Sequence, residues 1–146
     1  METRININQV DPEAYKAMMT LETYVHKSGL NRNHYELIKI RASQINGCAF
    51  CLDMHTKDAR KLGESEQRIY LLNAWHETTL FTETERAILS LTEEITKIQN
   101  GVSAETYSNA VKVLGENTTA QVIMAAVTIN AWNRIAITTQ LQPALA

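Results

Sequence analysis

Residues suited to thiol chemistry lie close together in the sequence, between Glu36 and His55. The stretch holds one carboxylate, both cysteines of the chain (Cys48 and Cys51) and one imidazole. In a helix, spacings of three and four residues place the two thiols and the imidazole on one face. Cysteines three apart at a helix start can close a disulfide, and the unpaired N–H groups there favour a thiolate. Cys51 is therefore the candidate nucleophile, and His55 the candidate acceptor of its proton.

Glu36 needs a bend in the chain to take part. It precedes the first cysteine by twelve residues, which is about 18 Å along a continuous helix. Asn46-Gly47 offers an interruption, so we predict a bend or turn at Gly47 that folds two helices together and brings Glu36 toward His55. With an unbroken helix over residues 36–55, only another subunit could supply this carboxylate.

The burial of Glu36 bears on its protonation. Glu36 shares a helical face with Ile40 and Ser43, which predicts partial burial. Burial raises the pKa of a carboxyl group, so we expect Glu36 to be able to hold a proton near neutral pH.

The elements that carry these residues are expected to be helices. Only five glycines and two prolines occur in 146 residues, too few for the many turns of a β-sandwich or barrel, while apolar residues recur at spacings of three and four. We predict an all-α fold, a compact bundle of about six to seven helices in a single domain, residues 1–146. Start and stop signals place the helices at about residues 12–28, 32–46, 48–62, 65–73, 83–100, 103–115 and 119–140.

Two helix starts are well marked. Asp11 before Pro12 reads as an N-cap, and Thr82 with Glu85 forms a capping box. The first of these helices has an apolar stripe that is expected to be buried, formed by Ala14, Met18, Leu21 and Val25.

Composition narrows the possible functions. A net charge of −2 without a polybasic run gives no reason to expect a nucleic-acid partner. The longest aliphatic run, residues 122–127, is far shorter than the roughly 20 residues of a membrane span. The N-terminus lacks a basic region followed by an apolar stretch, so we expect no secretory signal and a cytoplasmic protein. In that compartment a close cysteine pair is typical of redox chemistry or metal binding rather than of a permanent structural disulfide.

The motif resembles that of a known family. Glu36, eleven intervening residues, Cys48-x-x-Cys51, three residues and His55 are similar to the signature of the alkylhydroperoxidase D (AhpD) and carboxymuconolactone decarboxylase-like family, in its redox branch. The resemblance extends over about residues 30–135, and includes the segments 41–47, 74–78 and 83–87.

The resemblance implies a helical subunit that assembles into homo-oligomers, trimers or hexamers, with a thiol peroxidase site and no bound cofactor or metal. Cys51 would attack a hydroperoxide and become a sulfenic acid, and Cys48 would resolve it to a Cys48–Cys51 disulfide. Glu36 and His55 would relay protons. A dithiol donor, such as a lipoyl-bearing or thioredoxin-like protein, would reduce the disulfide again. The decarboxylase branch generally lacks the cysteine pair, so the lactone reaction is not expected.

One position departs from the family pattern. Well-described peroxidase members have a histidine directly before the second cysteine, where this chain has Phe50. Phenylalanine cannot relay a proton, so the proton path would run through His55 alone.

Two other functions stay open at this point. One is a disulfide reductase or redox sensor with weak peroxidase activity. The other is a non-enzymatic metal-binding or interaction module, whose metal site would be a zinc site formed by Cys48, Cys51, His55 and Glu36.

Overall fold

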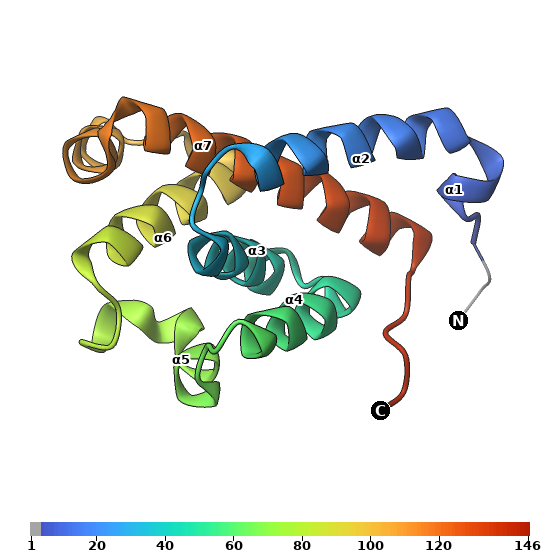
Figure 1. Ribbon diagram of the computed structural model, residues 1–146, viewed down its shortest axis with the longest axis horizontal. Helices are drawn as coiled ribbons and strands as arrows, with labels where there is room; N and C mark the ends of the chain where they lie inside the picture. The colour runs from blue at the N-terminus through green and yellow to red at the C-terminus, as the bar shows by residue number, and fades with distance from the viewer. Residues whose placement is uncertain (1–3) are drawn as a thin grey trace.

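The structure, a computed structural model, describes residues 4–146. Within this range the regular elements are seven α-helices and two 3-10 helices (η), without any strand (Figure 1). The predicted all-α fold with six to seven helices is confirmed. In chain order the elements are α1 (Ile7–Val10), α2 (Pro12–Lys27), α3 (Arg32–Asn46), α4 (Ala49–Lys61), α5 (Glu66–Tyr70), η1 (Leu72–Glu77), α6 (Glu83–Thr96), η2 (Ile98–Asn100) and α7 (Ala104–Thr139).

Helix α3 lies at the centre and is covered on several sides. It packs against α4, α6 and α7, and α2 runs along α7 at the top of Figure 1. Ile38 of α3 belongs to an apolar cluster shared with α2, α6 and α7, while Leu37 and Ile40 belong to a second cluster shared with α4, α5, η1 and α6. Because α3 is buried on both faces, its polar residues are held in fixed positions, and Glu36 is one of them.

The predicted helix caps are confirmed. The Asp11 side chain accepts a hydrogen bond from the backbone N–H of Ala14 at the start of α2. Thr82 and Glu85 form the reciprocal capping box at the start of α6. The predicted stripe of α2 is mostly wrong, because Val25 alone is buried, Met18 and Leu21 are half-buried and Ala14 is exposed. The helix α1 was not predicted.

Gly115 interrupts α7. Its backbone is non-helical (φ 79°, ψ 161°), and Figure 1 shows the helix changing direction near its beginning. The prediction that a helix ends at Gly115 is confirmed. The predicted new start at Thr119 is wrong, since helical structure resumes directly after the glycine.

Among residues 4–146, no helix has the length and apolar character needed to cross a membrane.

Candidate active site

The turn between α3 and α4 determines where the cysteines lie. Gly47 follows the last residue of α3 and adopts the left-handed conformation (φ 71°, ψ 37°), which glycine accepts at little cost. The backbone N–H groups of Gly47 and Cys48 both donate to the carbonyl of Ser43. The bend predicted at Gly47 is confirmed, and it returns α4 along the side of α3 (Figure 1).

Cys48 and Cys51 are joined in a disulfide at the start of α4, with Cα atoms 5.3 Å apart. Cys48 is the N-cap residue, and its Sγ accepts a hydrogen bond from the backbone N–H of Cys51 (3.3 Å). Both are buried, with 1% and 3% of their surface exposed. Phe50 of α4 and Ala136 of α7 pack against them. The first turn of α4 therefore directs a backbone N–H group at the sulfur of Cys48.

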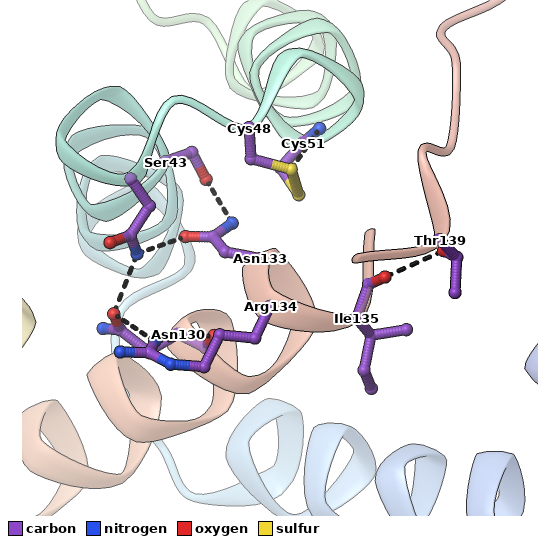
Figure 2. The surroundings of a disulfide bond; sticks show 9 residues. Ser43, Cys48, Cys51, Asn130, Asn133, Arg134, Ile135 and Thr139 are labelled. Carbon is purple, nitrogen blue, oxygen red and sulfur yellow. Dashed lines mark hydrogen bonds between the residues drawn. A yellow bond between two sulfur atoms is a disulfide. The ribbon is translucent and has the colours of Figure 1, made fainter. Parts of the chain in front are cut away.

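A buried set of amide side chains fastens the turn to α7 (Figure 2). Nδ2 of Asn133 donates to Oγ of Ser43 (2.9 Å). Nδ2 of Asn46 donates to Oδ1 of both Asn130 and Asn133, at 2.9 Å each. These three hydrogen bonds fix the end of α3 against α7, and they thereby fix the start of α4.

Glu36 and His55 come together as predicted, and a lysine joins them. Nδ1 of His55 lies 3.5 Å from Oε2 of Glu36, and neither atom has a hydrogen-bond partner within residues 4–146. The other carboxylate oxygen, Oε1, forms an ion pair with Nζ of Lys39 at 2.7 Å. The side chains of Glu36 and Lys39 are only 8% and 4% exposed. The carboxylate thus divides its two oxygens between a lysine and a histidine.

The ionisation expected for Glu36 is wrong. Burial, the largest influence, raises the pKa of Glu36, but the contacts with His55 and Lys39 together outweigh it. The pKa of Glu36 therefore lies below its ordinary value, and the residue is a carboxylate near neutral pH. The sequence argument recognised burial and the approach of His55, but it missed the ion pair with Lys39, which adds to the effect of His55.

The zinc ligand set considered from the sequence is not brought together in the described part of the chain. Donor atoms of Glu36, His55 and Asp58 lie within 4.8 Å of one another, and neither cysteine belongs to this group. Nζ of Lys39 already pairs with Oε1 of Glu36, so this carboxylate has one oxygen, Oε2, left for another partner.

A pocket of about 330 Å³ is lined by one of the two cysteines. Cys51, His55 and Phe50 form part of its wall, whereas Cys48 does not. The remaining wall is mostly apolar and comes from the N-terminal segment, α2, α4, α7 and the C-terminal segment. These residues are Asn6, Ile7, Asn8, Tyr15, Met19, Glu22, Met54, Trp132, Ile135, Ala136, Thr139 and Leu141.

Sequence reasoning missed Lys39 and the two asparagines of α7. Lys39 stands three residues after Glu36, a spacing that pairs opposite charges on a helix, so the signal was present. Asn130 and Asn133 are also three residues apart, in a segment rich in apolar residues. Two amides on one face of a buried helix indicate polar contacts, but not with which helix.

Known proteins are similar to this chain in sequence and in fold. Residues 12–94 match the model of the carboxymuconolactone decarboxylase family. The uncharacterized protein YdfG of Bacillus subtilis is 46% identical over 138 residues, which cover 94% of each chain. A protein of unknown function from Agrobacterium tumefaciens, provisionally named an antioxidant defence protein AhpD, has a crystal structure that is 42% identical. It superimposes with a TM-score of 0.96 over 99% of this chain and 100% of its own.

A more distant structure shares the fold alone. An uncharacterized peroxidase-related protein from Silicibacter is 20% identical, with a TM-score of 0.80 over 92% of this chain and 72% of its own. The family match extends over more than half of the sequence and includes both cysteines, Glu36 and His55. The chain belongs to the carboxymuconolactone decarboxylase family.

Proposed function

We propose that this protein is a thiol-dependent peroxidase that reduces hydroperoxides at Cys51. One observation carries the proposal: the pocket borders Cys51 and His55 but not Cys48. A substrate in this pocket meets one sulfur and one imidazole, which is the pair that thiol chemistry needs. Cys48, inside the protein and bonded to Cys51, is suited to the resolving role. The AhpD name of the relative from Agrobacterium is consistent with this assignment.

The reaction has three steps. The Cys51 thiolate attacks the outer oxygen of the hydroperoxide ROOH, the O–O bond breaks, and Cys51 becomes a sulfenic acid. The alkoxide RO⁻ leaves and takes up one proton to become ROH. The Cys48 thiol then attacks the sulfenic sulfur and releases water, which forms the Cys48–Cys51 disulfide. A dithiol donor reduces this disulfide to two thiols and is itself oxidised to a disulfide.

His55 and Glu36 move the protons in this scheme. The imidazole accepts the proton of the Cys51 thiol and returns it to the leaving oxygen. Glu36, held as a carboxylate, faces Nδ1 of His55 and stabilises the imidazolium that forms. Asp58 lies near this pair, and no step requires it.

The pocket supports a proposal for the substrate and for the donor. Its walls carry the side chains of Met19, Met54 and Trp132, which favour an organic hydroperoxide over hydrogen peroxide, since apolar walls bind an apolar substituent. The donor thiolate must enter by the same opening and attack Cys51. A lipoyl arm or the dithiol of a thioredoxin-like protein supplies a thiolate of this kind, and a reducing compartment such as the cytoplasm would keep that donor reduced.

Assembly into a homo-oligomer, a trimer or hexamer, is part of the proposal. It is supported by the apolar side chains that α1 and α2 expose in the single chain, among them Val10 and Tyr24. Exposed apolar groups of this kind are typical of contacts between subunits.

Two cysteine variants test the mechanism. Wild type, Cys51→Ser and Cys48→Ser are supplied with cumene hydroperoxide and dihydrolipoamide, and dithiol oxidation is measured. We expect turnover in wild type only. With dimedone as the trap, mass spectrometry should find a sulfenic acid at Cys51 in the Cys48→Ser variant, and none at Cys48 in the Cys51→Ser variant. Turnover by Cys51→Ser, or a sulfenic acid at Cys48, would overturn the assignment.

A disulfide reductase is the second candidate. Phe50 favours it, because this side chain lines the pocket where a second imidazole would assist peroxide cleavage. Disulfide exchange needs less acid–base assistance than O–O cleavage with an alkoxide leaving group. Reduction of a small disulfide such as oxidised glutathione, faster than reduction of any hydroperoxide, would favour this reading over the first.

A further inference from the structure

Lys39 is an ionised side chain inside the protein. Its side chain is 4% exposed, and its Nζ lies 2.7 Å from Oε1 of Glu36, one turn earlier on α3. Burying an ammonium group carries a desolvation cost, and removing the partner of a buried charge is strongly destabilising. Such a residue in the centre of the fold requires an explanation that packing alone does not give.

The surroundings of Lys39 hold its ammonium group in one place. Nζ lies 4.0 Å from the centre of the Tyr35 ring, at cation–π distance. The Tyr35 hydroxyl donates to Oε1 of Glu22 (2.9 Å), and Oε2 of Glu22 accepts from Nε1 of Trp132 (3.0 Å). The partners of Lys39 both lie on α3. One of them, Tyr35, is held from α2 through Glu22, which also binds Trp132 of α7.

This arrangement assigns one role to each oxygen of Glu36. With Oε1 occupied by Lys39, Oε2 is the oxygen that faces Nδ1 of His55. With Nδ1 turned to a carboxylate, Nε2 is the ring nitrogen left for the thiol proton. We propose that Lys39 is a positioning residue, which orients Glu36 so that His55 presents Nε2 to Cys51 and stabilises the Cys51 thiolate.

The charges around Glu36 predict how the loss of Lys39 affects the Cys51 thiolate. The titratable groups that face Glu36 are Lys39 and Tyr35 from α3, and His55 and Asp58 from α4. Among these four groups, Lys39 carries a positive charge whether or not the His55 imidazole is protonated. Its removal leaves the site more negative or leaves Glu36 protonated. Either change disfavours a Cys51 thiolate paired with an imidazolium.

The reactivity of Cys51 against pH provides the test, and this readout does not depend on peroxide turnover. In the Cys48→Ser background Cys51 is the only cysteine of the chain. The rate of its alkylation by iodoacetamide is measured from pH 4 to pH 10 by intact mass. Lys39→Met, Lys39→Arg and the control Lys57→Met are compared in this background. Lys57 is a half-exposed lysine of α4, paired with Asp53.

We expect the alkylation profile of Lys39→Met to move toward higher pH, so that the rate at pH 7 falls about tenfold, the change that one pH unit produces. Lys39→Arg keeps the positive charge and should restore most of the rate. Lys57→Met should match the background protein. An unchanged profile in a folded Lys39→Met protein would overturn the inference and leave Lys39 with a structural role.

A variant without either buried charge covers the case in which Lys39→Met does not fold. Glu36→Gln with Lys39→Met leaves no unpaired ion inside the protein, and it should show the same upward shift. An unshifted profile in this double variant would also overturn the inference.

The inference rests on the proposed function for its role in peroxide reduction, but the two fail separately. If wild type turns over peroxide but the alkylation profile of Lys39→Met is not shifted, the role of Lys39 is refuted. If the alkylation profile of Lys39→Met is shifted but wild type does not turn over peroxide, the proposed peroxidase function is refuted instead.

Discussion

Nδ2 of Asn133 donates a hydrogen bond to Oγ of Ser43 over 2.9 Å, across the contact between α7 and α3. Ser43 also accepts, through its carbonyl, the N–H groups of Gly47 and Cys48 in the turn that follows. One residue of α3 therefore connects the long C-terminal helix to the start of the cysteine motif. The position of the disulfide depends on α7, although α7 contributes none of the four residues of the motif.

Asn133→Ala should destabilise the protein and loosen the turn. Asn133 is fully buried, and its loss leaves the Ser43 hydroxyl without this donor and removes one acceptor of Asn46. We expect a loss of about 1–3 kcal/mol in the free energy of unfolding, measured by urea denaturation. Asn109→Ala, an exposed asparagine in the first part of α7, is the matched control and should change stability little. Equal stability of the two variants would show that the buried amide contacts contribute nothing.

Gly47→Ala should be costly for a conformational reason alone. A Cβ atom at this position would meet no other atom within 4 Å, so space is not limiting. The left-handed backbone (φ 71°) is the obstacle, and it should cost about 1–2 kcal/mol in the free energy of unfolding. Gly47→Asn is the control, because asparagine tolerates this conformation better. An alanine variant as stable as wild type would mean that the turn can form with another backbone conformation.

Much of the site could be predicted because its information is local. Gly47, the two cysteines and His55 lie within nine residues, and their helical spacing and the glycine break follow from short-range stereochemistry. Glu36 could be assigned only through the turn. The turn and the approach of His55 were predicted, but their effect on the pKa of Glu36 was not considered and the ion pair with Lys39 was missed. The predicted direction of the Glu36 pKa was therefore wrong.

The features that could not be predicted from the sequence depend on contacts between distant segments. Asn130 and Asn133 are more than 80 residues from their partners in α3. The pocket wall combines residues near both ends of the sequence, such as Ile7 and Leu141. The stripe of α2 failed because periodicity shows which face of a helix is apolar, but not whether this chain covers that face.

Glu85→Gln should destabilise the protein in a pH-dependent manner. Burial, the largest influence, raises the pKa of Glu85, but the hydrogen bonds from Arg68 and from the backbone of Thr82 outweigh it and hold the pKa below the ordinary 4.5. A carboxyl with a lowered folded-state pKa contributes its full stability above the unfolded value and loses it as the pH falls through the folded value. At pH 7 we expect a loss of about 1–3 kcal/mol relative to wild type.

Urea denaturation at several pH values measures this difference. It should be largest above about pH 5 and shrink as the pH falls through the lowered pKa of folded Glu85, where the wild-type side chain also becomes neutral. Glu83→Gln removes an exposed carboxylate from the same helical turn and serves as the control, with a small effect at every pH. A difference between Glu85→Gln and wild type that stays constant from pH 7 to pH 3 would contradict the role of the ion pair.

Phe50→His should increase the rate of hydroperoxide reduction. Phe50 lies between the cysteines and lines the pocket beside Cys51, so an imidazole there would supply a second group to protonate the leaving oxygen. A positioned acid or base of this kind contributes about a hundredfold or more when it is well aligned, and we expect about a tenfold gain from an unoptimised replacement. The measurement is the rate of Cys51 oxidation by cumene hydroperoxide, followed by stopped flow in the reduced protein.

Phe50→Leu separates the effect of the imidazole from that of a wider pocket. Leucine removes the ring without adding a proton donor, so its rate should stay near that of wild type, and the gain should belong to histidine alone. The gain should also disappear at high pH, where the new imidazole is neutral and cannot protonate the leaving oxygen. If histidine and leucine accelerate the reaction equally, access to Cys51 limits the rate and the proton path through His55 is already sufficient.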